Sequence, residues 1–126
     1  MKGGIEERAA LILSKPPHLV ADVRLYPTNE GGAKLSKSPG WGCLCCDSKS
    51  SFITHDDGKS YRFGHDGWPQ LKEPLTPGDQ RRLGFVFLFS GEEALELFRK
   101  ARVFYLWEGR IIGEAVIVKD TPLLGT

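Results

Sequence analysis

Short hydrophobic runs, most of them ended by glycine or proline, alternate with polar segments along this chain. In the run over residues 19–26, apolar side chains alternate with Asp22 and Arg24, which is typical of a β-strand with one buried face. Further strands are expected over residues 41–46, 83–89, 103–107 and 111–118. The nearly continuous apolar composition of residues 83–89 indicates a strand that is covered on both faces.

Glycine-containing triplets lie between or beside these runs. They are Glu30-Gly31-Gly32, Pro77-Gly78-Asp79 and Glu108-Gly109-Arg110. Glycine adopts positive φ readily and proline presets the φ of a turn's second residue, so the triplets predict turns between antiparallel strands. The expected fold is therefore mainly β, a small barrel or sandwich made of hairpins.

An additional β-hairpin is expected around Asp57-Gly58. If these two residues form a type I′ loop, the register of the hairpin follows from it. The facing pairs would be Phe52 with Phe63, Ile53 with Arg62, Thr54 with Tyr61, and Ser50 with His65.

One short helix is expected after the strand at residues 83–89. Ser90 and Glu93 have the spacing of a capping box. Apolar residues then recur at helical spacing as far as Ala101. Basic residues lie near the expected C-terminal end, where the helix dipole favours cations, namely Arg99, Lys100 and Arg102.

The 126 residues are expected to fold as a single domain. Residues 1–17 form an apolar-rich N-terminal segment that stops at Pro16-Pro17, because proline lacks the N–H group that regular structure needs. The barrel is expected over about residues 18–119, and residues 120–126 form a tail.

The charge balance favours neither a nucleic acid nor a membrane as partner. With 17 basic and 16 acidic residues, the formal net charge is +1. No run approaches the roughly 20 apolar residues of a membrane span, and the first residues lack a signal-peptide core. The odd number of cysteines, three within four positions, does not form a disulfide framework, so a cytoplasmic setting is expected.

Neither a metal site nor a catalytic group is expected. Cys43, Cys45 and Cys46 lack the paired spacing of a structural zinc site, and strand alternation directs the last two to opposite faces. Nothing places His18, His55 or His65 beside a cysteine as a general base. Asp56, Asp57 and Asp66 are better explained by turn chemistry, because the second and third directly precede glycine. No cofactor is expected.

The tryptophans and the arginines each leave two interpretations open. Trp107 lies in an apolar run and is expected in the core. Trp41 and Trp68, which adjoin glycine and proline, either anchor a partner or cover an end of the barrel. The clusters at residues 81–82 and 99–102 form either a basic patch or, as we favour, a solvated rim.

In their order, these motifs resemble the C-terminal (third) domain of elongation factor Tu. The resemblance covers about residues 6–119. Its elements are Glu7-Arg8, Leu13-Ser14-Lys15-Pro16, Ala21-Asp22-Val23, Pro39-Gly40-Trp41, the three glycine triplets and Gly113. It implies a closed, six-stranded antiparallel β-barrel, here with an added β-hairpin and one short helix.

The chain also differs from that family at positions that bear on its function. The chain has no phosphate-binding loop, so no GTP is expected. The family places arginines near the tRNA at two positions where this chain has Ala33 and Gly42. Residues 50–67 and 90–102 are longer than the family's loops, and insertions on a retained scaffold are where a new partner surface is expected.

The resulting hypothesis is a non-enzymatic binding protein whose partner is another protein, for example a toxin that a small immunity protein occludes. The alternative is an RNA-binding module that contacts tRNA or ribosomal RNA through the loop from Lys34 to Trp41. The candidate partner-binding residues are Lys34, Lys37, Trp41, Asp56, Asp57 and Trp68.

Overall fold

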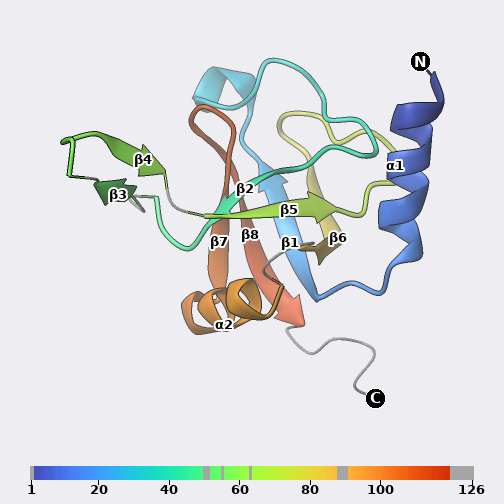
Figure 1. Ribbon diagram of the computed structural model, residues 1–126. Helices are drawn as coiled ribbons and strands as arrows, with labels where there is room; N and C mark the ends of the chain where they lie inside the picture. Colours follow the sequence, from blue (N-terminus) through green and yellow to red (C-terminus); the bar gives the residue numbers. More distant parts are fainter. Residues whose placement is uncertain (1, 50–51, 55, 63, 88–90, 120–126) are drawn as a thin grey trace.

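The computed structural model describes residues 2–49, 52–54, 56–62, 64–87 and 91–119 (Figure 1). The elements run in the order α1 (Lys2–Ser14), β1 (Leu19–Leu25), the 3-10 helix η1 (Thr28–Glu30), β2 (Cys43–Cys46), β3 (Phe52–Thr54), β4 (Ser60–Arg62), β5 (His65–Pro69), β6 (Gln80–Val86), α2 (Gly91–Ala101), β7 (Val103–Trp107) and β8 (Ile111–Lys119). Among these described residues, no helix has the length and hydrophobicity needed to cross a membrane.

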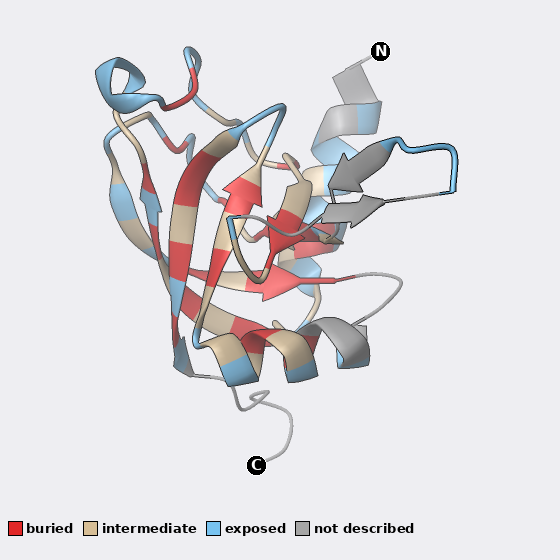
Figure 2. Ribbon diagram, turned by 90° about the vertical axis from the view of Figure 1, so that its left-hand side faces the viewer, coloured by how far each residue is buried: buried red, intermediate tan, exposed pale blue. Residues whose placement is uncertain are grey.

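Six strands close into an antiparallel barrel in the order β1-β6-β5-β2-β7-β8, as expected for the fold class. β1 pairs with both β6 and β8, and its alternate residues are buried, which confirms the pattern in the sequence. Figure 2 shows a similar alternation of buried and more exposed residues along β7. The hairpin β3–β4 forms a separate two-stranded sheet beside the barrel.

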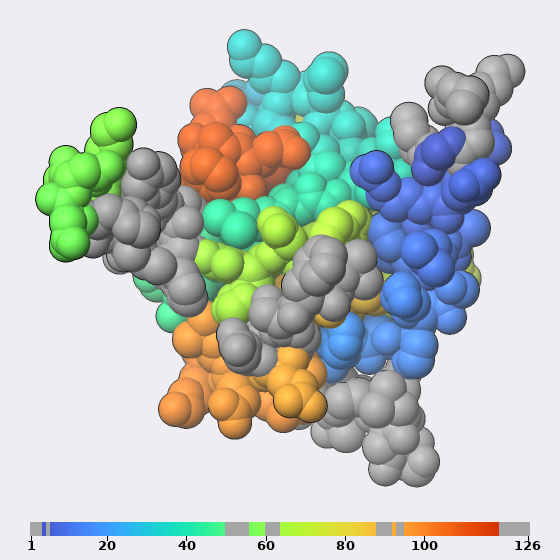
Figure 3. Space-filling model, in the orientation of Figure 1, coloured from blue at the N-terminus to red at the C-terminus, as the bar shows by residue number. Residues whose placement is uncertain are grey.

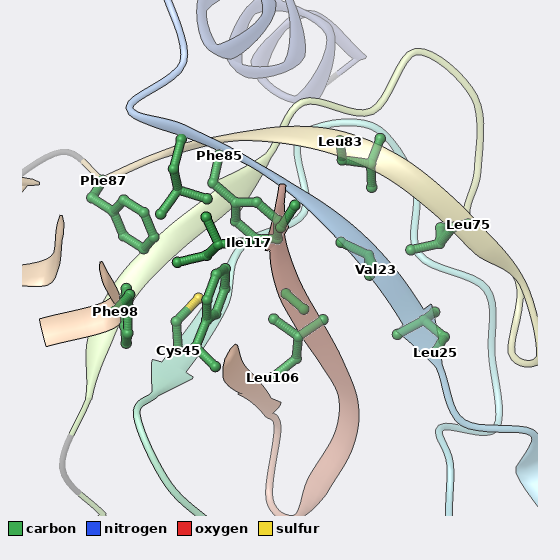
Figure 4. Packing of buried hydrophobic residues seen from close by; sticks show 14 of the residues in the cluster. Val23, Leu25, Cys45, Leu75, Leu83, Phe85, Phe87, Phe98, Leu106 and Ile117 are labelled. Carbon is green, nitrogen blue, oxygen red and sulfur yellow. The ribbon is translucent and has the colours of Figure 1, made fainter. Parts of the chain in front are cut away.

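Aromatic rings fill the barrel interior (Figure 4). The rings of Phe98 and Phe104 stack with centroids 4.6 Å apart, and Phe85 meets Phe104 edge-on at 5.0 Å. Phe98 comes from α2 and is fully buried, so this helix closes the lower end of the barrel in Figure 1. The expected helix is confirmed, although Ser90 of the proposed capping box lies outside the described residues.

All three glycine triplets form turns, but only the second and third lie between strands that pair with each other, β5 with β6 and β7 with β8, because β1 does not pair with β2. Gly31, Gly78 and Gly109 have φ angles of 89°, 95° and 78°, a region that side chains disfavour. All three turns lie at the upper end of the barrel in Figure 1, opposite α2. The loops at this end are tied together by a bridge between Lys37 and Leu75.

The sequence pattern predicts one helix, but the structure has a second, α1, within the N-terminal segment. Its apolar residues follow one another instead of recurring at helical spacing. Docking on the barrel holds it: Ile12 is 3% exposed, and the Gln70 side chain donates hydrogen bonds to the carbonyls of Ile12 and Lys15. Tertiary contacts therefore stabilise a helix that the sequence alone does not indicate.

The predicted register of the hairpin is wrong by one residue. Thr54 pairs with Ser60, and Phe52 pairs with Arg62. Gly58 has a φ of 82°, but Asp57 lacks the positive φ that a type I′ turn also needs at its first central residue. Phe63 and His55 lie outside the described residues.

The structure also moves His65 out of the hairpin. It begins β5, a barrel strand that the sequence does not predict, and pairs with Cys45 instead of Ser50. β5 contains glycine and proline and lacks alternation, so pairing with β2 and β6 determines it. A Cβ at Gly67 would lie 2.6 Å from the Phe87 ring, so the absence of a side chain at this position leaves room for that ring in the core.

Three further expectations are corrected. β2 begins at Cys43, two residues later than expected. β6 covers Gln80–Val86 instead of residues 83–89, and residues 88–90 lie outside the described part, as does the tail at 120–126. Trp107 is half-buried on the outer face of β7, because only Phe104 and Leu106 of that strand reach the core.

Candidate functional site

The candidate residues lie in three separate regions of the molecule. Lys34, Lys37 and Trp41 belong to the loop at the upper end of the barrel (Figure 1). Asp56 and Asp57 form the tip of the β3–β4 hairpin, which projects from one side. Trp68 is half-buried on β5, beside α1. Among the described residues, the structure brings Lys37 and Trp41 together, and Trp68 lies against Gly42, the residue after Trp41.

Lys37 and Trp41 meet at Glu108, in the turn between β7 and β8. The carboxylate accepts a hydrogen bond from Lys37 Nζ through Oε1 and one of 2.9 Å from Trp41 Nε1 through Oε2. The Lys37 ammonium also lies 5.4 Å from the centre of the Trp41 ring, a cation–π contact. Glu108 thus joins two residues that lie about 70 positions earlier in the chain.

The backbone of the loop holds these side chains in place. Lys37 exchanges two backbone hydrogen bonds of 2.8 Å with Leu75. Trp41 N–H donates to the Ser38 carbonyl at 3.0 Å, and the Arg110 guanidinium donates to the Gly32 carbonyl at 3.1 Å. Hydrogen bonds therefore connect the loops at the upper end of the barrel to one another.

Charge at this end is largely neutralised. Partial burial acts to raise the pKa of Glu108, but the hydrogen bonds from Lys37 and Trp41 and the Lys37 charge outweigh it and lower the pKa. The Lys37 side chain is only 13% exposed, so its ammonium group is committed to Glu108. Lys34 is exposed and pairs with none of the described residues. One accessible lysine remains in the loop proposed to bind RNA.

The hairpin tip is exposed over Asp56, Asp57, Gly58 and Lys59. The Lys59 N–H donates a hydrogen bond of 2.9 Å to the Asp57 side chain, which fixes the loop locally. The ribbon behind it has two strands of three residues each and belongs to no larger sheet.

Trp68 lies against the loop on one side and α1 on the other. A Cβ at Gly42 would come within 2.4 Å of the Trp68 indole nitrogen, so the ring covers the glycine backbone. On its other side, a groove of about 380 Å³ separates Trp68 from α1. Trp68 therefore covers the backbone at Gly42 on one side, and its half-exposed ring faces the groove on the other, where a partner could contact it.

Arg81 and Arg82 are engaged within the fold. Arg82 makes a bidentate contact with Asp22, with hydrogen bonds of 2.9 and 3.3 Å. Arg81 donates to the carbonyls of Glu73 and Pro74, both at 3.0 Å. These contacts fit the solvated rim of the barrel better than a patch that receives phosphates.

The cysteines behave as core residues. Cys45 is fully buried, and burial raises the pKa of its thiol, so the reactive thiolate is disfavoured. Cys46 is also buried and Cys43 half-buried, and none of the three forms a disulfide with a described residue. Within the described ranges, no group of three or more His, Cys, Asp and Glu side chains is placed to hold a metal ion.

A second polar cluster, which the sequence does not predict, lies on the outer wall. The Tyr26 hydroxyl donates a hydrogen bond of 2.8 Å to Glu114, and burial together with that carboxylate raises the pKa of Tyr26. The Lys49 ammonium lies 5.3 Å from the Tyr105 ring centre and 5.9 Å from that of Tyr26. The strand register pairs Tyr105 with Glu114, and the outward alternation of β7 and β8 is the only sequence signal for it.

Comparison with known proteins does not identify a family for this chain. No protein-family model matches the chain, and no curated protein matches it in sequence. The assignment of function therefore rests on the site itself.

Proposed function

We propose that this chain is a non-enzymatic protein-binding module on a barrel of the type found in the third domain of elongation factor Tu. The observation that carries the proposal is the β3–β4 hairpin, a separate two-stranded sheet with an exposed acidic tip. Figure 1 shows it projecting from the barrel wall.

An isolated two-stranded hairpin is marginally stable in water, because it has no further strand or helix to cover it. The six strand residues of this hairpin include Phe52, Ile53 and Tyr61, residue types that favour strands. A partner that packs on the hairpin would stabilise this two-stranded sheet, while Asp56 and Asp57 at its exposed tip would meet basic groups. A small domain that occludes a toxin in this way is the setting that we favour.

The RNA alternative has weaker support. Its key residue Lys37 is bonded to Glu108, which leaves Lys34 as the accessible cation of the loop. Binding through phosphates would need several such cations, because each contact neutralises one phosphate charge.

A capture experiment from the source cell tests the proposal. The full chain should recover one stoichiometric protein partner. Changing both Asp56→Asn and Asp57→Asn should weaken binding about tenfold, the loss of roughly 1.4 kcal/mol. The matched control is Glu30→Gln with Glu73→Gln, which removes the same charge from exposed positions outside both insertions and should leave capture unchanged.

Two outcomes would contradict the proposal. One is the absence of any stoichiometric partner. The other is filter binding of tRNA whose affinity falls steeply with salt, with a log–log slope of about one unit per phosphate contact, which would establish the RNA alternative.

A further inference from the structure

The groove between α1 and β5 has the properties of a peptide-binding site. Figure 1 shows β5 pointing toward α1, and in Figure 3 the two elements lie next to each other on the face toward the viewer. The groove has a volume of about 380 Å³. Its lining residues are Gly4, Glu7, Arg8, Leu11, Ile12, Lys15 and Trp68.

The middle of the groove is apolar and only partly covered. Ile12 is buried and fixes α1 to the barrel, while Leu11 beside it is 55% exposed. Burying a leucine side chain completely contributes about 1.5–3 kcal/mol, so an exposed leucine next to an aromatic ring leaves binding energy unused. Trp68 supplies that ring, and its contact with Gly42 limits how far it can move.

The rim of the groove is positive. Arg8 and Leu11 are three residues apart on α1 and therefore lie along one side of the helix. Lys15 directly follows the last helical residue and also lines the groove. Neither cation forms an ion pair with a described residue. Against these two positive charges stands one acidic lining residue, Glu7, so the lining carries a net charge of +1.

From these features, we propose that the groove binds an acidic peptide segment of the protein partner, with an apolar side chain inserted between Leu11 and Trp68. The charge of the rim selects carboxylates, and the apolar centre selects an aliphatic or aromatic anchor. Both cations line the groove together with Leu11 and Trp68, which form its apolar centre. Acidic residues on both sides of the anchor therefore fit the two cations.

This inference rests on the proposed function, because it names the chemistry of the same protein partner. The two sites can nevertheless be tested separately. In Figure 1 the hairpin projects on the side of the barrel opposite α1. A change in the groove therefore leaves the hairpin tip untouched.

The experiment selects peptides from a phage-displayed library of random dodecamers on the full chain, with counter-selection on the Leu11→Asp variant. The enriched peptides should share an apolar residue between acidic ones. A synthetic peptide with that consensus, followed by fluorescence anisotropy, should bind at least tenfold more weakly to Leu11→Asp and to Arg8→Glu. The effect of Arg8→Glu should shrink as salt is added, because salt screens exposed charges.

Matched controls separate the groove from the surface in general. Leu35 is 76% exposed and lies outside the groove, so Leu35→Asp introduces the same change elsewhere and should leave peptide affinity within twofold. Lys100→Glu, at an exposed position on α2 outside the groove, is the corresponding control for charge reversal. Circular dichroism and thermal unfolding establish that each variant is folded.

The inference would be overturned by peptides without acidic residues, by no enrichment over Leu11→Asp, or by equal losses in Leu11→Asp and Leu35→Asp. Binding of a polyuridine oligonucleotide that depends on Leu11 would also overturn it. If the Asp56 and Asp57 changes weaken partner capture while Leu11→Asp does not, the proposed function stands and the groove assignment is wrong. If the consensus peptide binds in the groove but no partner is captured, the groove assignment stands and the proposed function is wrong.

Discussion

Gly113 shows how a single residue allows the barrel to close. It is buried in β8, where it pairs with Leu25 of β1 and Leu106 of β7. A Cβ at this position would lie 2.8 Å from the Arg24 carbonyl oxygen and 3.1 Å from a methyl carbon of Leu25. Backbone can give way less easily than the end of a side chain, so the strands would have to separate.

Replacement of Gly113 by alanine is therefore expected to destabilise the protein by about 1–3 kcal/mol, the usual effect of overpacking. Urea unfolding followed by tryptophan fluorescence measures this loss. Gly4→Ala is the matched control, because a Cβ there meets nothing within 4 Å and alanine favours a helix. Equal midpoints for Gly113→Ala and the unmodified protein would show that the strands accommodate the methyl group.

Single residues also show where sequence information ends. Alternation predicts the buried side of β1 correctly, because each position depends only on its neighbours. The contact of Lys37 and Trp41 with Glu108 depends on a fold that joins distant segments, so local pattern does not reveal it. The prediction that Trp107 lies in the core is wrong for a related reason. An apolar run contains residues of both faces of a strand, and only the closed barrel determines which face points inward.

At the scale of elements, the strands with strong alternation and glycine turns are predicted, and those held by tertiary contacts are not. β7, β8 and their turn follow the sequence closely. α1 and β5 instead form through contacts between distant parts of the chain. Gln70, directly after β5, donates hydrogen bonds to carbonyl groups at the C-terminal end of α1. The groove between them was therefore not predictable from the sequence.

The docking of α1 gives the prediction at this scale. The Gln70 side-chain amide donates hydrogen bonds of 2.9 and 2.7 Å to the carbonyls of Ile12 and Lys15. Gln70→Ala should weaken docking by about 1–3 kcal/mol, because each bond contributes about 0.5–1.5 kcal/mol. Hydrogen exchange should show faster exchange in α1 with the barrel strands unchanged. Gln80→Ala, at an exposed position, is the control, and unchanged protection of α1 in Gln70→Ala would contradict this account.

For the whole molecule, two contacts that close the barrel depend on protonation. At the seam of β1 and β6, the Phe87 N–H donates a hydrogen bond of 3.0 Å to His18 Nδ1, which requires a neutral imidazole. Partial burial and the nearby Lys15 lower the pKa of His18 from its usual 6.5. At the upper end, the Glu108 carboxylate bonded to Lys37 has a pKa below its usual 4.5.

The lowered pKa values of His18 and Glu108 both make the folded protein less stable in acid, but they act in different pH ranges. A folded-state pKa below that of the unfolded chain means that the unfolded chain binds more protons, so acid favours unfolding. Stability should first decline as the pH falls through about 6.5, from His18, and again below about 4.5, from Glu108. Urea midpoints between pH 8 and pH 3 measure the two phases. His18→Gln, which keeps an acceptor that does not titrate, should remove the first phase alone, and Glu108→Gln should reduce the second. If the first phase persists in His18→Gln, another group controls it and the seam is not the acid-sensitive contact.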